Sequence, residues 1–271
     1  MSIKKNFHTH TTYCDGKNTP EEMVKAAIAL GFTALGFSGH AHTPFDLSYA
    51  MSHAAADKYY AEINALKAEY CGRIELYCGI EQDYYSDEPV SRWDYVIGSV
   101  HYVLKNGEYI PVDETAQILK DAAIKHYGGD IYGLVEDYFA TVADVVGKTN
   151  ADIIGHFDLI TKFNEGEAMF SESDPRYVDA YRAALIKLIP YNKPFEINTG
   201  AMARGYRSAP YPSKQILQDI YNMGGSIAIS SDCHDKAALD YGFDEAASLA
   251  KSCGFKSFMV ITKDGLKSEE L

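Results

Sequence analysis

The sequence predicts an α/β fold, a barrel of parallel strands that alternate with helices. Short apolar segments alternate with longer amphipathic segments along the whole chain. Several of the short segments are apolar throughout, as expected for parallel strands that are covered on both faces. The 271 residues contain no Pro/Ser-rich linker, and single-domain barrels commonly have this length. We therefore expect one domain over residues 1–271 with a closed or nearly closed sheet.

Eight short segments are predicted to be strands. In chain order they are Ile3–His10, Ala34–His40, Ile74–Asp83, Tyr95–Tyr102, Ile153–Ile160, Pro194–Thr199, Ser226–Ser231 and Phe255–Thr262. Seven helical patterns lie between or after them: Thr19–Leu30, His53–Tyr70, Thr115–Tyr127, Asp130–Lys148, Asp174–Ile189, Ser213–Met223 and Phe243–Ser252. Thr19 before Pro20 and two acids is typical of a helix start, and Ser213 is the expected cap of a later helix. Gly31 and Gly254 are typical of helix ends that precede a strand.

The helical stretch from Asp113 to Lys148, interrupted by Gly128-Gly129, is expected to be an insertion of two helices. An open doubly wound sheet is the alternative architecture. No Gly-x-Gly-x-x-Gly or Gly-x-x-x-x-Gly-Lys motif follows a strand, so the barrel is preferred.

The composition excludes several classes of partner. A net charge of −13 argues against nonspecific binding to nucleic acid and against binding to anionic membranes. The first residues lack the apolar stretch of a signal peptide, and no segment is long and apolar enough to span a membrane. Five cysteines without Cys-x-x-Cys spacing predict a reduced, cytoplasmic protein. Cys14 and Cys233 adjoin candidate ligands, but strand alternation favours small buried hydrophobes over zinc ligands.

Histidines and carboxylates recur at the ends of the predicted strands. His8 and His10 are separated by one residue, so on a strand both imidazoles point to one side and can bind one cation. Further candidates lie at or just beyond the C-terminal ends of this strand and of the later ones: Asp15, His40, His42, Glu81, His101, His156, Asp158, Glu196, Asn198, Asp232 and His234. Of nine histidines, only His53 and His126 lie outside this pattern. Because the C-terminal ends of barrel strands meet on one face, these residues are expected to converge there.

These residues resemble the polymerase-and-histidinol-phosphatase (PHP) family of metallophosphoesterases. The resemblance covers almost the whole chain, and its motifs are His8-Thr9-His10 with Asp15, His40, Glu81, His101, His156 and Asp232-Cys233-His234. Chain length, Ser38-Gly39-His40-Ala41-His42 and Glu196-Ile197-Asn198-Thr199 are most similar to the histidinol-phosphate phosphatase group. The resemblance implies a distorted TIM-like barrel of about seven strands, which would leave 255–262 at the periphery.

The resemblance also implies a trinuclear metal site. One metal would take His8, His10, Glu81 and Asp232; a second would share Glu81 and add His101 and His156; the third would take Asp15, His40 and His234. The family often has histidine at the position of Asp15. A carboxylate is a harder ligand, so zinc, manganese and iron all remain possible.

The charge balance of this site favours a phosphate substrate. Six neutral histidines, three carboxylates and three divalent ions would leave a positive pocket inside an acidic protein. A hydroxide formed at the metals would attack phosphorus directly, because no side chain is placed as an activated nucleophile. The residues expected to serve catalysis are His42, Glu81 and Asp232, and either His42 or metal-bound water would donate a proton to the leaving group.

The substrate-binding candidates are His42, Arg204, Arg207 and Lys162. His42 follows His40 by two residues and would face the same side of a continuing strand, although an ordinary hydrogen-bonded loop histidine is the alternative. Guanidinium groups fit phosphate oxygens, and Arg204 is preferred to Arg207. Asp158, Glu196 and Asn198 would orient imidazoles or bond neighbouring backbone groups, and contact of Glu196 with the substrate is a further alternative. Tyr84, Tyr85 and Tyr102 are expected near the mouth.

The leading hypothesis is hydrolysis of a small phosphomonoester, L-histidinol phosphate. A phosphotyrosine-protein phosphatase is the first alternative, but the loop 41–54 and the insertion 113–148 are long enough to cover a small substrate. An amidohydrolase-type deaminase or lactonase also begins with His-x-His, but commonly bridges its metals through a modified lysine. A noncatalytic PHP module is the last alternative, and the complete ligand set argues against it.

Overall fold

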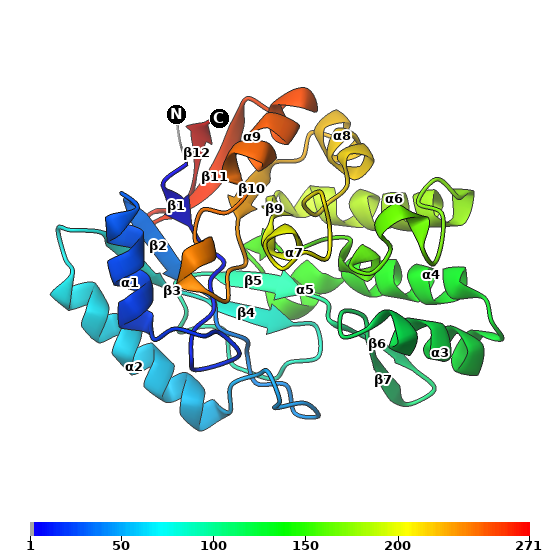
Figure 1. Cartoon of the computed structure of the whole chain (residues 1–271), viewed down its shortest axis with the longest axis horizontal. Coiled ribbons are helices and arrows are strands. Elements are labelled where there is room, and N and C mark those ends of the chain that lie inside the picture. Colours follow the sequence, from blue (N-terminus) through cyan, green and yellow to red (C-terminus); the bar gives the residue numbers. More distant parts are fainter. Residues whose placement is uncertain (1–2) are drawn as a thin grey trace.

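The chain folds into a parallel α/β barrel, seen in the computed structural model, which describes residues 3–271 (Figure 1). The barrel strands are β1 (Lys5–Asn6), β2 (Ala34–Phe37), β3 (Glu75–Cys78), β4 (Ile80–Asp83), β5 (Val96–Ser99), β8 (Ile153–Ile154), β9 (Phe195–Asn198) and β10 (Ile227–Ser230). Three of them pair in the order β1-β2-β3, and five in the order β10-β9-β8-β5-β4. All of these pairs are parallel.

Two bridges beyond the regular strands close the two sheets into a ring. Thr9 pairs with Cys233, which joins the extension of β1 to that of β10, and His40 pairs with Glu81. Strands β3 and β4 form one stretch that is interrupted only at Gly79. The ring therefore has seven strand positions, and the expected distorted TIM-like barrel is confirmed.

The interruption at Gly79 has a packing cause. A Cβ atom on Gly79 would lie 2.4 Å from the ring of Tyr95, and one on Gly36 would lie 2.4 Å from the Tyr95 hydroxyl. This hydroxyl is 2.5 Å from the Phe7 carbonyl and 3.1 Å from the Phe37 carbonyl. Tyr95 thus occupies space that two glycines leave open and ties three strands together.

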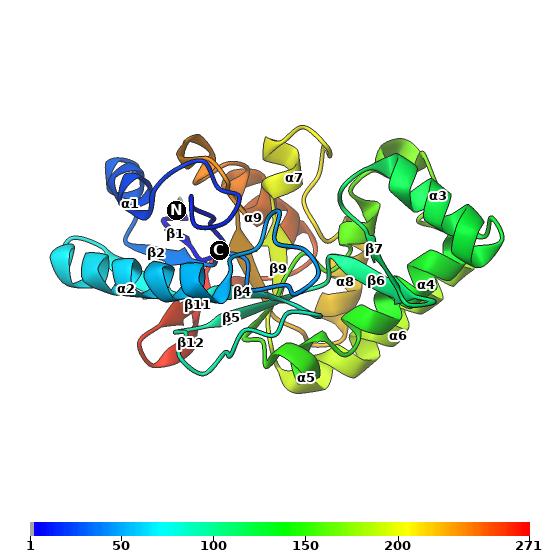
Figure 2. The same ribbon diagram turned by 90° about the horizontal axis from the view of Figure 1, so that it is seen from below.

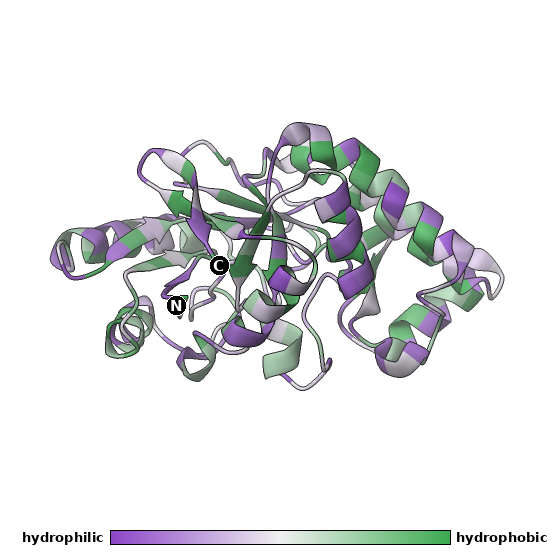
Figure 3. Ribbon diagram, turned by 90° about the horizontal axis from the view of Figure 1, so that it is seen from above, coloured by the Kyte–Doolittle hydropathy of each residue, from purple (hydrophilic) through white to green (hydrophobic). Residues whose placement is uncertain are grey.

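The helices are α1 (Pro20–Ala29), α2 (His53–Glu69), α3 (Ala116–Tyr127), α4 (Ile131–Val142), α5 (Val145–Thr149), α6 (Pro175–Leu188), α7 (Gly200–Ala203), α8 (Lys214–Asn222) and α9 (Phe243–Ser252). All but α7, which was not predicted, lie within or close to the predicted ranges. Thr19 caps α1 in a reciprocal arrangement with Glu22. Ser213 occupies the expected cap position of α8, but its side chain makes no capping hydrogen bond. Figure 3 shows apolar strands in the interior and helices whose residues alternate in hydropathy. No helix of residues 3–271 is long and apolar enough to cross a membrane.

The insertion and the C-terminal segment lie outside the barrel. The antiparallel hairpin of β6 (Tyr102–Lys105) and β7 (Glu108–Pro111) precedes α3, and the predicted stretch 130–148 divides into α4 and α5. Helices α3, α4 and α6 pack in sequence to one side of the barrel (Figure 2). β11 (Ser257–Thr262) pairs antiparallel with β12 (Gly265–Glu270), so this segment is peripheral, as expected.

Candidate metal centre

The predicted ligands converge at the C-terminal ends of the barrel strands. Here a cavity of about 520 Å³ is lined by Asp15, His40, Ser48, Tyr49, Glu81, His101, Tyr102, Asp113, Glu114, His156, Leu159, Lys162, Arg204, Tyr206, Asp232 and His234. His8 and His10 are fully buried beneath it. A larger cavity of about 830 Å³, near the N-terminal ends of β2 and β3, has no histidine in its lining. The chemistry therefore belongs to the smaller cavity.

Glu81 lies at the middle of the donor cluster, and its two oxygens face different imidazoles. Glu81 Oε2 is 3.1 Å from His8 Nε2 and 3.0 Å from His40 Nδ1. Glu81 Oε1 is 3.0 Å from His156 Nε2 and 3.5 Å from His101 Nε2. A carboxylate placed in this way can bridge two cations.

One group of four atoms fits a single divalent cation. The Nε2 atoms of His8 and His10 lie 3.1 and 3.5 Å from Glu81 Oε2, and 3.7 and 3.2 Å from Asp232 Oδ1. Ligands about 2.1 Å from a tetrahedral cation stand about 3.4 Å apart. His8 Nε2, His10 Nε2 and Glu81 Oε2 are buried without a hydrogen-bond partner. Buried polar atoms normally have one, so a cation is the partner that this group fits.

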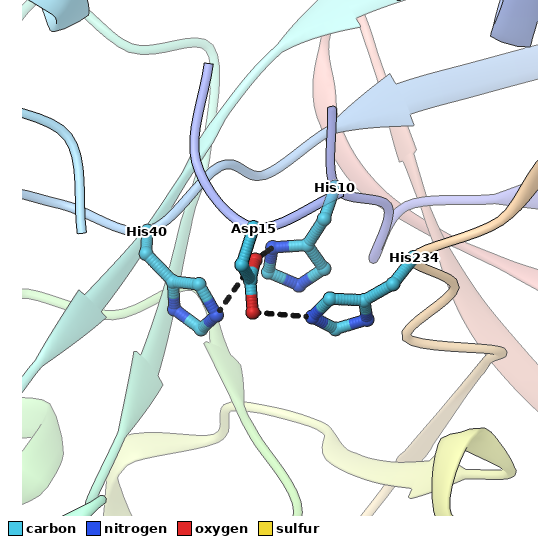
Figure 4. A group of neighbouring side chains, drawn as sticks. All are labelled: His10, Asp15, His40 and His234. Atoms are coloured by element: carbon cyan, nitrogen blue, oxygen red, sulfur yellow. Dashed lines mark ion pairs between the residues drawn. The ribbon is translucent and has the colours of Figure 1, made fainter. Parts of the chain in front are cut away.

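A second group surrounds Asp15 (Figure 4). Asp15 Oδ2 is 3.0 Å from His234 Nε2, and Asp15 Oδ1 is 3.6 Å from His40 Nε2 and 3.7 Å from His10 Nδ1. His10 and His40 each direct one ring nitrogen towards Asp15 and the other towards Glu81. The nine predicted ligands therefore form one continuous cluster, in which His10 and His40 adjoin two groups.

Carboxylates behind the cluster hold the imidazoles in place. Glu196 lies 2.5 Å from His8 Nδ1 and accepts the backbone N–H of His156 at 2.8 Å. Asp83 lies 3.2 Å from His101 Nδ1. Such outer carboxylates fix the tautomer and direction of a metal-binding histidine. Asp83 was missed in the sequence, although its place two residues after Glu81 on a strand puts both on one face.

Asp158 and Asn198 make different contacts. Asp158 accepts the backbone N–H of Ser213 at 3.0 Å, which is the structural role considered for it. Asn198 donates to Glu196 at 2.9 Å and to Asp232 at 3.3 Å. Asn198 thus links a supporting carboxylate to a candidate ligand.

The buried donors of the metal centre have pKa values shifted in both directions. Burial lowers the pKa of His10 to about 3, so its imidazole is neutral. Burial opposes ionisation of Glu81 and Asp232, but nearby histidines, and Arg204 beside Asp232, hold both pKa values well below their usual range. Burial also opposes the charged forms of His8, His40 and His101, but nearby carboxylates raise their pKa values, that of His101 to about 9. Because cations bind neutral imidazoles and ionised carboxylates, metal binding is expected to release protons from these three histidines. Burial raises the pKa of Cys14 and of Cys233 to about 12, which keeps both as thiols.

Two of the four candidate substrate-binding residues line the cavity. Arg204 donates to the Asp232 carbonyl at 3.0 Å and lies 3.3 Å from its carboxylate. Lys162 donates to the Asp113 carbonyl at 2.7 Å. Arg207 instead donates to the Thr161 carbonyl at 2.7 Å, and its buried side chain is not part of the lining.

His42 is also absent from the cavity lining. The bridge between His40 and Glu81 ends the pairing of this strand, so the two-residue alternation from His40 does not continue. The His42 ring instead lies 2.6 Å from Asp87 and stacks on His53 with 3.9 Å between ring centroids. The geometry does not place His42 for proton donation inside the cavity.

Six lining residues were not anticipated: Ser48, Tyr49, Asp113, Glu114, Leu159 and Tyr206. Tyr49 comes from the loop between β2 and α2, and Asp113 and Glu114 come from the start of the insertion. No local spacing in the sequence relates them to the metal ligands. Tyr84 and Tyr85 are not in the lining, whereas Tyr102 is.

The fold and the cluster together define a metal-binding α/β barrel protein with a polar cavity at the C-terminal ends of its strands. The chain belongs to the PHP domain family, whose domain matches residues 6–200. It is 27% identical over 285 aligned positions to a probable histidinol-phosphatase of Schizosaccharomyces pombe, covering 97% of this chain and 90% of that protein. It is 24% identical over 265 positions to the histidinol-phosphatase of Bacillus subtilis, covering 89% and 97%.

A solved structure shares the fold over nearly the whole chain. It is the histidinol phosphate phosphatase of Lactococcus lactis subsp. lactis in complex with zinc, L-histidinol and phosphate. The TM-score is 0.72 at 20% identity, and the alignment covers 98% of this chain and 100% of that one.

Proposed function

We propose that this protein hydrolyses L-histidinol phosphate to L-histidinol and phosphate. The observation that carries the proposal is the continuous cluster of nine donors, all but Asp15 buried or half-buried, at a cavity that Arg204 and Lys162 also line. A phosphate dianion needs cations on several of its oxygens, and this arrangement provides them from one side. The curated relatives that align along most of the chain carry the same activity in their names.

Three divalent cations, zinc, manganese or iron, are proposed to bind the cluster. His8, His10, Glu81 and Asp232 would hold one; Glu81, His101 and His156 a second; Asp15, His40 and His234 the third. When bound, such cations polarise phosphate oxygens and acidify water. Glu81 and Asp232 serve the reaction by holding the cations at fixed separation.

The remaining cavity residues divide between the two ends of the substrate. Arg204, fixed against Asp232, and Lys162, fixed against Asp113, would bind nonbridging phosphate oxygens. The carboxylates of Asp113 and Glu114 suit the amine of the leaving alcohol. Tyr49 and Tyr102 offer aromatic surface to its imidazole.

A steady-state screen of phosphomonoesters on metal-reconstituted enzyme tests this proposal. We expect the kcat/KM of L-histidinol phosphate to exceed that of generic sugar phosphates and of a phosphotyrosine peptide by at least about 100-fold. Equal values for histidinol phosphate and sugar phosphates would contradict the substrate assignment. A preference for the phosphotyrosine peptide would favour a protein phosphatase.

A further inference from the structure

A second group of histidines and carboxylates lies outside the metal centre. His42 Nδ1 is 2.6 Å from Asp87 Oδ1, and His53 Nε2 is 3.5 Å from the same oxygen. The two imidazoles stack with 3.9 Å between centroids and a tilt of 26°. One donor atom from each of the three residues lies within 4.8 Å of the others. The proposed hydrolysis uses none of the contacts among His42, His53 and Asp87.

A buried carboxylate supports this group from behind. Glu88 Oε2 lies 2.7 Å from His53 Nδ1, and the Glu88 side chain is only 2% exposed. Arg92 donates to the other Glu88 oxygen at 2.8 Å and so fixes the carboxylate. The bond to Glu88 takes up Nδ1 and turns Nε2 of His53 towards Asp87. Histidines that bind metals are usually held by an outer carboxylate in this manner.

The group also lies at a defined place on the chain. His42 and His53 stand at the two ends of the loop 43–52, which contributes Ser48 and Tyr49 to the lining of the catalytic cavity. Asp87 belongs to the segment that follows β4. A cation bound to all three side chains would close this loop at its base and attach it to a second segment. Such a cross-link removes loop entropy in the same way as a disulfide.

We propose that His42, His53 and Asp87 form a peripheral divalent-cation site that fixes the loop 43–52 over the cavity. Two imidazole nitrogens and one carboxylate oxygen favour zinc, nickel or copper over magnesium or calcium. The cation takes the place of the proton in the hydrogen bond between His42 and Asp87. The acidic net charge of the protein favours the approach of a cation. The site does not depend on the reaction catalysed at the main centre.

Calorimetric titration of the zinc-loaded, desalted holoenzyme with Ni²⁺ tests the site. We expect one equivalent of Ni²⁺ to bind, and the zinc that remains, measured by elemental analysis, to equal the zinc content of His53→Ala. His53→Ala should abolish this equivalent, and Asp87→Asn at an exposed position should weaken it. Glu88→Gln should lower the affinity by about 10- to 100-fold. His126→Ala is the matched control, because His126 has Glu108 at 3.1 Å but belongs to no three-residue donor group among residues 3–271.

Hydrogen exchange of the loop 43–52 gives a second measurement, which does not depend on the heat of Ni²⁺ binding. Ni²⁺ should slow exchange over 43–52 in the wild-type protein and in His126→Ala, but not in His53→Ala. The proposal is overturned if the holoenzyme binds no Ni²⁺ and holds no more zinc than His53→Ala does, or if His53→Ala and Asp87→Asn bind Ni²⁺ as the wild type does. It is also overturned if Ni²⁺ binds without slowing exchange in the loop.

Discussion

At the scale of single residues, Glu81 has the central position in the metal centre. Glu81 on β4 pairs with His40, which follows β2, and its two carboxylate oxygens face two sets of imidazoles. Ser99 donates to Oε1 at 2.6 Å and fixes the carboxylate plane. One side chain thus couples the geometry of at least two candidate cation sites.

Glu81→Ala is expected to lose more than one equivalent of bound metal, because removal of the carboxylate takes a ligand from two groups. The kcat/KM for a phosphomonoester should fall by at least about 100-fold. Elemental analysis after dialysis gives the metal content. Glu114→Ala, which removes a lining carboxylate without any ion pair to an imidazole, should retain the full content. Unchanged metal in Glu81→Ala would remove Glu81 from its bridging role.

Arg204 is expected to contribute to catalysis, and Arg207 is expected to contribute to stability. Arg204→Gln should lower kcat/KM by about 10- to 100-fold with little change in Tm, because its guanidinium faces the cavity beside Asp232. Arg207→Gln should leave kcat/KM nearly unchanged but cost about 2–4 kcal/mol of stability, because it removes a buried charge near Glu172. Steady-state kinetics and urea unfolding of both variants separate the two roles. The reverse pattern would show that the wrong arginine was assigned to phosphate.

The candidate ligands could be read from the sequence because each follows an apolar strand within a short motif. The outer residues could not, since their positions depend on long-range packing. Asp113 reaches the cavity from the insertion, and no spacing links it to His101 or Lys162. His42 shows a different kind of difference. Strand alternation predicts that it faces the same side as His40, but the pairing of this strand ends at His40.

At the scale of elements, the sequence located helices and buried strands but not the hairpins. The hairpin of β6 and β7 turns at Asn106-Gly107, where both residues have positive φ. Asn-Gly between strands is a strong hairpin signal, and it was overlooked. The regular strands are also shorter than predicted, because the residues at their C-terminal ends turn into the metal centre instead of continuing the ladder.

A carboxylate between two helices gives a pH-dependent prediction. Burial opposes ionisation of Asp219 on α8, but its bonds from Arg182 and Tyr181 of α6, each 2.8 Å, lower its pKa below the usual value. A lowered pKa in the folded state stabilises the protein above the unfolded pKa, near 3.9, and this gain is lost as the pH falls through the folded value. Asp219→Asn should therefore cost about 1–2 kcal/mol at pH 7.

The difference between wild type and Asp219→Asn should shrink as the pH falls below about 4. Urea unfolding of the two proteins at each pH measures it, and loss of metal at low pH affects both alike. Gln215→Ala removes a longer bond to the same carboxylate, at 3.3 Å, and should have a smaller effect. A difference that stays constant with pH would show that the charge of Asp219 contributes nothing.

At the scale of the whole molecule, closure of the barrel concentrates charge at one end. Most βα units deliver one to three of the nine donors, β9 contributes the supporting Glu196, and the ring of seven strands turns these side chains inwards. Without cations, the buried carboxylates of Glu81, Asp232 and Glu196 lie close together beside the more exposed Asp15, and their charges are offset by histidines and, at Asp232, by Arg204. The metal centre is therefore expected to stabilise the fold as well as the reaction.

Chelation is expected to lower the Tm of the protein by about 10 °C or more. A cation held at 1,000 times its Kd contributes about 4 kcal/mol, and each kcal/mol shifts Tm by about 2–4 °C in a chain of this size. Scanning calorimetry with and without chelator measures the shift, and added zinc should reverse it. Glu81→Ala should respond less to chelator than the wild type, because it begins with fewer cations. Equal Tm values for the loaded and stripped wild-type protein would mean that the barrel tolerates its crowded carboxylates without metal, and that the donors are held together by packing alone.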